Sequence, residues 1–157
     1  MSRQASERES GHTSKTTEGS IVVTTDRARF DLDVIHGFLT RSYWAEGIPR
    51  ETVARSMEHS LCFGAFDGDR QVGFARVISD RTTYAYISDV FALESDRKRG
   101  IGKSLMAAIM SHPELQGLRR WTLATRDAHG LYRQFGFGAP AHPDRQMEIL
   151  DRTPYHA

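Results

Sequence analysis

The sequence predicts one domain of the mixed α/β or α+β type, with helices packed on the faces of a central sheet. Its 157 residues are enough for one sizeable core but not for two. From residue 21 onward, strand-like and helix-like segments follow each other in the order β-α-α-β-β-β-α-β-α-β. Consecutive hairpins followed by a βαβα stretch predict a mixed sheet with helices on its faces.

The segment before this pattern, residues 1–20, is polar, charged and rich in Ser and Thr. It has almost no large apolar side chain to offset the entropy cost of ordering, so we expect a mobile tail, or a partner-binding arm, ahead of a domain over 21–157.

The first half of the domain combines one strand with two helices. The β-branched run Ile21–Thr25 predicts a strand. Asp31 stands in the N-cap position of a helix over Leu32–Tyr43. Pro49 suits the first turn of a second helix, Glu51–His59.

The remaining elements begin with a hairpin. Asp67-Gly68-Asp69-Arg70 is a turn signal between two strand-like runs, and a second turn at 80–83 leads to a third run. The predicted elements from here on are strands over 61–66, 71–79 and 84–93, a helix over 100–111, a strand over 120–124, a helix over 128–135 and a last strand, Gln146–Leu150.

Charge and cysteine content narrow the class of protein. Lys and Arg total 21 against 20 Asp and Glu. The net charge of +1 argues against a protein whose main role is to coat nucleic acid or a membrane surface. The single cysteine, Cys62, excludes an internal disulfide and fits a reducing cytoplasm. No apolar run approaches the roughly 18 residues that span a bilayer, and the N-terminus lacks a secretory apolar stretch. The histidines show no metal-ligand spacing, so no metal is expected.

The segment Arg97-Lys-Arg-Gly-Ile-Gly-Lys-Ser104 is the most informative motif. It lies between a predicted strand and a helix, where unpaired amides and close-approaching glycines favour a phosphate group. A Walker A loop would need glycine at Arg97, and a dinucleotide fingerprint would need it at Leu105, so both assignments fail. A solvated basic turn with a glycine cap is the simpler alternative.

Two motifs in register resemble the GCN5-related N-acetyltransferase (GNAT) superfamily. Arg97-x-x-Gly100-x-Gly102 is similar to its acetyl-CoA signature, and Ala128-x-x-Leu-Tyr132-x-x-x-Gly-Phe137 to its later helix–turn motif. The resemblance covers about residues 21–150 and implies a mixed sheet of about six to seven strands with about four helices. It also implies that the strands over 84–94 and 120–124 splay apart to admit the cofactor. Many members pair as homodimers, although no local feature here decides this.

The resemblance implies a cofactor site for acetyl-CoA. Backbone groups of Val90, Phe91 and Ala92 would contact the pantetheine or thioester. The pyrophosphate would be held by the turn formed by Arg97, Lys98, Arg99, Gly100, Ile101, Gly102, Lys103 and Ser104. Two positions depart from the family pattern: Lys98 stands where glycine is most frequent, and Thr125 where asparagine is common.

The resemblance also assigns the chemistry. Tyr132 matches the family's general acid, and a phenol stays protonated at neutral pH; otherwise it is a core aromatic. Asp89 is our first choice for holding or deprotonating the amine, with a structural ion pair to Arg76 as an equal alternative.

The acceptor would be bound by the loop after the first helix. Tyr43 and Trp44 form a binding wall, unless their rings close the core instead. Arg76, if not engaged with Asp89, would meet a substrate carboxylate, and His129 lies on the same helical face as Tyr132. Cys62 is interpreted as a core residue rather than a nucleophile.

The sequence therefore predicts a cytoplasmic acetyl-CoA-dependent N-acetyltransferase for a small amine or amino-acid-like substrate. Three alternatives stay open: acetylation of a protein amine, a non-catalytic CoA-binding regulatory module, and an unrelated anion-binding domain.

Overall fold

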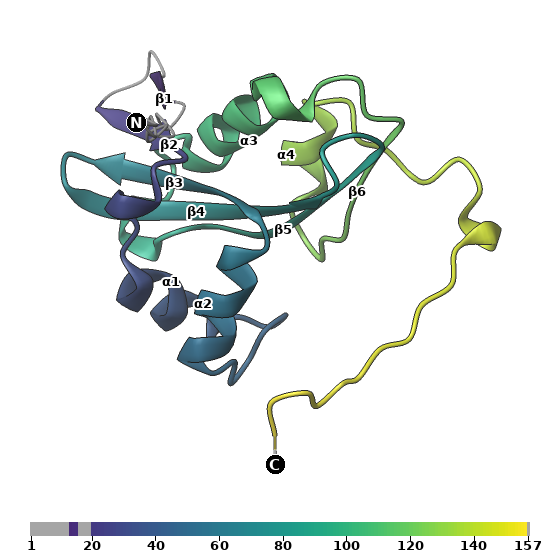
Figure 1. The fold of residues 1–157 in the computed structure, drawn as a ribbon, viewed down its shortest axis with the longest axis horizontal. Coiled ribbons are helices and arrows are strands. Elements are labelled where there is room, and N and C mark those ends of the chain that lie inside the picture. The colour runs from purple at the N-terminus through teal and green to yellow at the C-terminus, as the bar shows by residue number, and fades with distance from the viewer. Residues whose placement is uncertain (1–12, 16–19, 157) are drawn as a thin grey trace, which may run out of the picture.

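A computed structural model describes residues 13–15 and 20–156. These residues form a six-stranded sheet between two helical layers, with α1 and α2 on one face and α3 and α4 on the other (Figure 1). The strands are β1 (Thr13–Lys15), β2 (Ile21–Thr24), β3 (Leu61–Asp67), β4 (Arg70–Ser79), β5 (Tyr84–Ala92) and β6 (Arg120–Leu123). The α-helices are α1 (Leu32–Leu39), α2 (Arg50–Glu58), α3 (Ile101–Ser111) and α4 (His129–Arg133). The predicted mixed layer fold is confirmed.

The sheet is antiparallel from β1 to β5 and parallel between β5 and β6. The parallel pairing runs only from Tyr84↔Arg120 to Ile87↔Leu123. The second half of β5, residues 88–92, therefore has no partner on β6. The two strands separate at this point, as the sequence resemblance implied.

A β-bulge lies at the start of this unpaired half. The pairing of β4 with β5 shifts between Arg76↔Ser88 and Phe74↔Phe91, so β5 contains one extra residue. Asp89 takes up this residue with a φ of 54°, in the left-handed region that few non-glycine residues occupy.

Each face of the sheet carries its own core. On one face, α3 contributes Leu105 and Ile109, both fully buried against β3, β4 and β5. On the other face, Ile35 and Val53 of α1 and α2 pack against Phe74 and neighbouring side chains. The two helical layers hold β5 between them, and β5 in turn positions the pocket described below.

The start of α1 matches the prediction, but its end does not. The Asp31 carboxylate accepts hydrogen bonds from the amides of Asp33 and Val34, as an N-cap does. The helix ends at Leu39 rather than Tyr43, because the Ser42 hydroxyl donates to the Leu39 carbonyl at 2.7 Å and stops the helical pattern. The shorter helix releases Tyr43 and its neighbours into a loop.

The predicted strand over 146–150 is wrong for this structure. These residues are exposed and pair with no strand of the described chain, because they do not run beside a free edge of the sheet. Most of the predicted tail, 1–12 and 16–19, lies outside the described residues. Its described part, Thr13–Lys15, is not a free tail but pairs with β2 through the strand ladder, and the Thr13 and Thr24 hydroxyls lie within hydrogen-bond distance at 3.4 Å.

Candidate functional site

A pocket of about 460 Å³ lies where β5 and β6 separate. It is bounded by three segments that are distant in the sequence: the loop after α1, the end of β5, and the turn after β6. The lining residues are Phe38, Arg41, Ser42, Tyr43, Trp44, Val90, Phe91, Ala92, Glu94, Arg97, Arg126 and Asp127. The pocket thus unites six residues predicted for the site: Tyr43, Trp44, Val90, Phe91, Ala92 and Arg97.

Aromatic rings form one wall of this pocket. Phe38 stacks on Phe91 with ring centroids 4.1 Å apart, and Trp44 lies 6.2 Å from Phe38. Tyr43 and Trp44 are 50% and 41% exposed and line the pocket, so the pair does not close the core. The Arg126 guanidinium lies 3.9 Å above the Tyr43 ring, and its amide donates to the Tyr43 hydroxyl at 3.2 Å.

Asp89 is held between two donors. Arg76 Nε donates to one carboxylate oxygen at 2.8 Å, and Trp44 Nε1 donates to the other at 2.9 Å. Arg76 also donates to the Ser60 hydroxyl at 3.1 Å. The ion-pair alternative for Asp89 is therefore observed. Arg76 is engaged, so the condition under which it would meet a substrate carboxylate is not fulfilled in this structure.

The glycine-rich turn has the geometry of an anion site. Gly100 is the N-cap of α3 with a φ of 70°. The first amides of this eleven-residue helix have no hydrogen-bond acceptor within the helix and carry partial positive charge. A Cβ on Gly102 would lie 3.1 Å from Leu131 Cδ2, so this glycine also lets α3 and α4 approach closely. Lys98 adopts a φ of 66°, which accounts for the glycine that the family pattern favours there.

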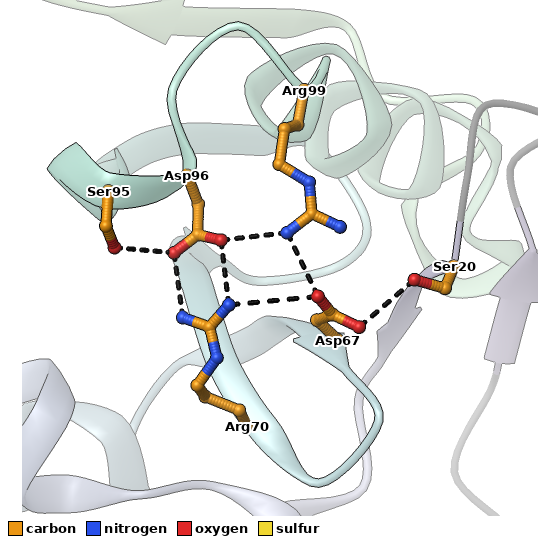
Figure 2. A network of polar contacts seen from close by, with 6 residues as sticks. All are labelled: Ser20, Asp67, Arg70, Ser95, Asp96 and Arg99. Atoms are coloured by element: carbon orange, nitrogen blue, oxygen red, sulfur yellow. Dashed lines mark hydrogen bonds and ion pairs between the residues drawn. The ribbon is translucent and has the colours of Figure 1, made fainter.

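The basic side chains of the turn divide into two groups. Arg97, Lys98 and Lys103 are exposed and leave the turn electropositive. The Arg99 side chain instead turns inward, where Nη1 donates to Asp96 at 2.8 Å and to Asp67 at 3.0 Å (Figure 2). The predicted role of Arg99 is thereby limited to its backbone amide.

Asp96 is the centre of this network. Its side chain is 3% exposed and also accepts two hydrogen bonds from Arg70 and one from Ser95. Hydrogen bonds from Arg70, and further ones from Ser95 and Arg99, lower the pKa of the Asp96 carboxyl well below its usual range. Hydrogen bonds from Arg99 and Ser20 likewise lower the pKa of Asp67. The network fastens the turn to the β3–β4 hairpin from behind.

Two members of the turn contribute their backbone only. The Ile101 side chain is buried in the core beside α3. Ser104 is buried, and its hydroxyl donates to the Gly100 carbonyl at 3.0 Å. Thr125, which stands where the family favours asparagine, accepts a hydrogen bond from the Ala128 amide at 3.0 Å and thereby supports the start of α4.

Tyr132 lies on α4 with its ring buried and 8% of its surface exposed. The ring packs edge-on to Phe137 at 6.3 Å. No buried side-chain oxygen among the described residues lacks a hydrogen-bond partner, and the Tyr132 hydroxyl has none there, so this hydroxyl must reach accessible space. Burial, with smaller contributions from Tyr43 and Asp127, raises the pKa of Tyr132 to about 12.

Two other candidates lie apart from the pocket lining. His129 is exposed at the first residue of α4. Cys62 is buried in the core beside α1 and α2, and burial raises the pKa of its thiol to about 11, which confirms a core residue rather than a nucleophile. No cluster of metal-ligating side chains occurs in residues 13–15 and 20–156.

Sequence reasoning missed the contribution of Phe38, Arg41, Arg126 and Asp127 to the pocket. Arg126 and Asp127 directly follow the strand predicted over 120–124, which was already placed beside the cofactor gap. Their position at the carboxyl end of that strand was therefore a usable signal.

Comparisons with known proteins agree with the fold. A sequence model of the acetyltransferase (GNAT) family matches residues 31–137. A crystal structure of a GNAT-family acetyltransferase from Xanthomonas campestris pv. campestris is 50% identical and covers 87% of this chain and 97% of its own, with a TM-score of 0.85. A curated acetyltransferase of Gibberella zeae is 28% identical over 74% of this chain and 77% of its own.

A third relative shares the fold at lower identity. It is an acetyltransferase from Clostridium acetobutylicum, solved with acetyl-CoA, which is 14% identical with a TM-score of 0.57 and covers 76% of this chain and 90% of its own. The sheet that opens between β5 and β6, with the glycine turn beside it, belongs to the fold of these acetyltransferases. The chain belongs to the acetyltransferase (GNAT) family.

No helix among the residues described has both the length and the apolar content that crossing a membrane demands.

Proposed function

We propose that this protein transfers the acetyl group of acetyl-CoA to a primary amine of a small molecule or an amino-acid-like substrate. The observation that carries the proposal is the convergence of three features: a half of β5 without a partner on β6, a glycine turn with exposed cations at the start of α3, and an aromatic pocket wall. The pocket of about 460 Å³ is in the range of small-molecule sites. A reducing cytoplasm suits the free thiol of Cys62.

The residues present fit the proposed cosubstrate. On the side of β5 that has no partner on β6, the main chain of Val90, Phe91 and Ala92 would offer amide and carbonyl groups to the pantetheine arm. The amides from Arg97 to Ser104, with the exposed cations of Arg97, Lys98 and Lys103, would hold the pyrophosphate.

In the reaction, a neutral amine attacks the thioester carbonyl, a C–N bond forms and the C–S bond breaks. A backbone N–H of the bulged region near Val90 would stabilise the negative charge on the carbonyl oxygen. Tyr132 would donate its phenolic proton to the departing thiolate, and the proton lost from the attacking nitrogen would return to the phenolate through water. A pKa raised to about 12 keeps that proton available throughout the neutral range.

Asp89 would bind the incoming amine. Arg76 and Trp44 fix the carboxylate in one orientation, each through one hydrogen bond to one oxygen. Each carboxylate oxygen has a further lone pair that can accept from an ammonium or a water. Asp89 would therefore hold the amine beside the thioester and pass its excess proton to water.

Tyr132→Phe tests the acid assignment. We expect kcat to fall by about 10²-fold, the lower range for loss of a general acid, with acetyl-CoA affinity nearly unchanged. Tyr84→Phe is the matched control, because the Tyr84 hydroxyl on β5 bonds to Thr122 on the neighbouring strand β6, and Tyr84 does not line the pocket. Equal turnover of Tyr132→Phe and wild type would remove Tyr132 from the mechanism.

The engagement of both Asp89 oxygens, one by Arg76 and one by Trp44, supports a second candidate, a CoA-binding module without a working base. Both candidates predict that CoA at about 100 times its Kd stabilises the fold by about 2.7 kcal/mol. Only the enzyme releases free CoA when acetyl-CoA is mixed with a panel of amines. A preference for peptides over small amines in that panel would indicate a protein amine as the acceptor.

A further inference from the structure

The pocket where β5 and β6 separate is lined by three arginines whose side chains donate no hydrogen bond to any residue that the structure describes. They are Arg41, Arg97 and Arg126. Arginines that support the fold behave differently, because Arg70 and Arg76 each donate a side-chain hydrogen bond to a carboxylate at 2.8 Å. The pocket therefore holds guanidinium donors that the fold itself does not use.

These three arginines divide between the two ends of the pocket. Arg97 belongs to the glycine turn, where its guanidinium lies 4.0 Å from the Glu94 carboxylate. Arg41 comes from the loop after α1, and Arg126 from the turn after β6. Beside these two, the pocket lining has one carboxylate, that of Asp127. Two positive charges against one negative charge leave this end of the pocket with a net charge of +1.

Arg126 is held in place by the flat face of its guanidinium. The guanidinium carbon lies 3.9 Å from the centre of the Tyr43 ring, and the Arg126 amide donates to the Tyr43 hydroxyl at 3.2 Å. An arginine stacked on a ring keeps its N–H donors at the edge of the guanidinium plane, where a carboxylate can accept two of them. Asp127 lies 3.7 Å from the guanidinium, longer than the roughly 2.9 Å of a charge-assisted hydrogen bond, so it leaves these donors available.

Arg41 extends from a main chain that the loop fixes. The Arg41 amide donates to the Phe38 carbonyl at 3.2 Å. The next side chain, Ser42, is buried, and its hydroxyl donates to the Leu39 carbonyl at 2.7 Å and accepts from the Ala45 amide at 3.1 Å. The Arg41 side chain is exposed and forms no ion pair within the described part of the chain. A fixed backbone thus presents a cation without a counter-ion to the pocket.

A continuous series of contacts connects Arg126 with Asp89, the carboxylate proposed to bind the amine. The Tyr43 ring on which Arg126 stacks meets Trp44 edge-on, with centroids 5.1 Å apart. Trp44 in turn donates to Asp89 at 2.9 Å. A cation, two rings and an anion therefore follow each other along the pocket wall. A ligand with matching features would carry an ammonium at one end, an apolar body, and an anionic group at the other end.

We propose that the acceptor is an amine whose carboxylate is separated from the nitrogen by an apolar body, and that Arg126 and Arg41 bind this carboxylate. The inference rests on the acetyl transfer proposed above, where Asp89 binds the amine. One carboxylate on the ligand balances the net charge of +1 at this end of the pocket. Arg76, which is engaged by Asp89, is not needed for this role.

The first test measures binding rather than turnover. The probes are para-(aminoethyl)benzoate and para-(aminoethyl)benzamide, which have nearly the same shape and differ by one negative charge. Isothermal titration into the protein saturated with CoA is expected to give a Kd about 10-fold lower for the benzoate. Potassium chloride at about 0.5 M should reduce this preference by screening. Equal affinities of the two probes, or no detectable binding of the benzoate, overturn the proposal.

Arginine variants locate the carboxylate. Arg126→Gln and Arg41→Gln should each reduce the preference for the benzoate to about 3-fold or less, whereas Arg126→Lys should retain part of it, because lysine keeps the charge but not the planar pair of donors. Arg55→Gln is the matched control, since Arg55 is exposed on α2 and does not line this pocket, and it should keep the full preference. If Arg126→Gln and Arg41→Gln weaken CoA binding as much as benzoate binding, these arginines serve the cofactor and the proposal is overturned.

Release of free CoA from acetyl-CoA with the same probes separates this proposal from the proposed reaction. We expect kcat/KM to be about 10-fold higher for the benzoate than for the benzamide. If both probes are acetylated equally well, acetyl transfer stands and the carboxylate site is wrong. If neither probe releases CoA while the benzoate still binds about 10-fold more tightly, the carboxylate site stands and the proposed reaction is wrong.

Discussion

Asp89 and Asp96 lie on either side of the end of β5, and both carboxylates bind arginine, yet their surroundings differ. Asp96 is 3% exposed and accepts hydrogen bonds from Arg70, Ser95 and Arg99, the last of these a member of the glycine turn. Asp89 is 9% exposed and shares its oxygens between Arg76 and the indole of Trp44, which lines the pocket. Asp96 fastens the glycine turn to the β3–β4 hairpin, whereas Asp89 fastens the loop after α1 to the bulge of β5. A carboxylate–arginine pair thus supports a turn at one end and an aromatic pocket wall at the other.

The largest effect should follow from Asp96→Ala. The change leaves Arg70 and Arg99 with Asp67 as their one remaining shared partner, and these cations are 53% and 34% exposed. Because both retain some contact with water, we expect a loss of about 2 to 3 kcal/mol, below the range for a fully buried pair. Urea denaturation measures this loss. Asp33→Ala, at an exposed ion pair with Arg50, is the control and should change stability by less than about 1 kcal/mol.

Asp89→Asn should affect turnover more than stability. The amide oxygen can still accept from Trp44, but the negative charge that would hold the amine is lost. We expect kcat/KM for the amine to fall about 10-fold, equal to about 1.4 kcal/mol, with acetyl-CoA affinity unchanged. If acetyl-CoA affinity fell as well, the division of labour between Asp89 and Asp96 would be wrong.

Stability should also depend on pH through the Asp96 network. The folded pKa values of Asp96 and Asp67 are lowered, chiefly by hydrogen bonds from Arg70 and Arg99 respectively. Their contribution is therefore complete above the unfolded pKa of about 3.9 and is lost as the pH falls below it. Unfolding measured from pH 6 to pH 2.5 should show a shallower decline for Asp96→Asn than for the wild type. Parallel curves would show that Asp96 does not titrate with folding.

The smallest effect is expected at Lys98. Lys98→Gly relieves a φ of 66° but frees the unfolded backbone, so the two contributions to stability should nearly cancel, within about 1 kcal/mol. Loss of the charge should weaken CoA binding about 2- to 5-fold, since exposed charge pairs contribute little. Isothermal titration checks the affinity, and Lys15→Gly, far from the turn in sequence, serves as the charge control.

Elements whose ends are set by residues close to those ends were predicted correctly from the sequence. The Asp31 cap, the hairpin at 67–70 and the glycine start of α3 all follow from side chains and φ angles near each position. The separation of β5 from β6 was predicted only from the family resemblance, because the residues of one strand do not show where its pairing with another strand ends.

The failures have a different origin. The end of α1 depended on one hydroxyl, that of Ser42, which competes for the Leu39 carbonyl. Arg99 seemed free in a basic run, but Asp67 and Asp96 on neighbouring elements draw its side chain inward. The strand over 146–150 has a correct pattern and no partner in its own molecule, since a sequence pattern specifies which face is apolar but not which edge receives it.

The chain contains two tryptophans, Trp44 and Trp121. The first lines the pocket and donates to Asp89, while the second stands on β6, partly buried against the core beneath α3. Indole emission responds to solvent and to neighbouring groups, so variants with a single tryptophan separate two signals. Trp121→Phe leaves a reporter of ligand entry at the pocket, and Trp44→Phe leaves a reporter of unfolding of the α3 core, so both events can be followed without an attached dye.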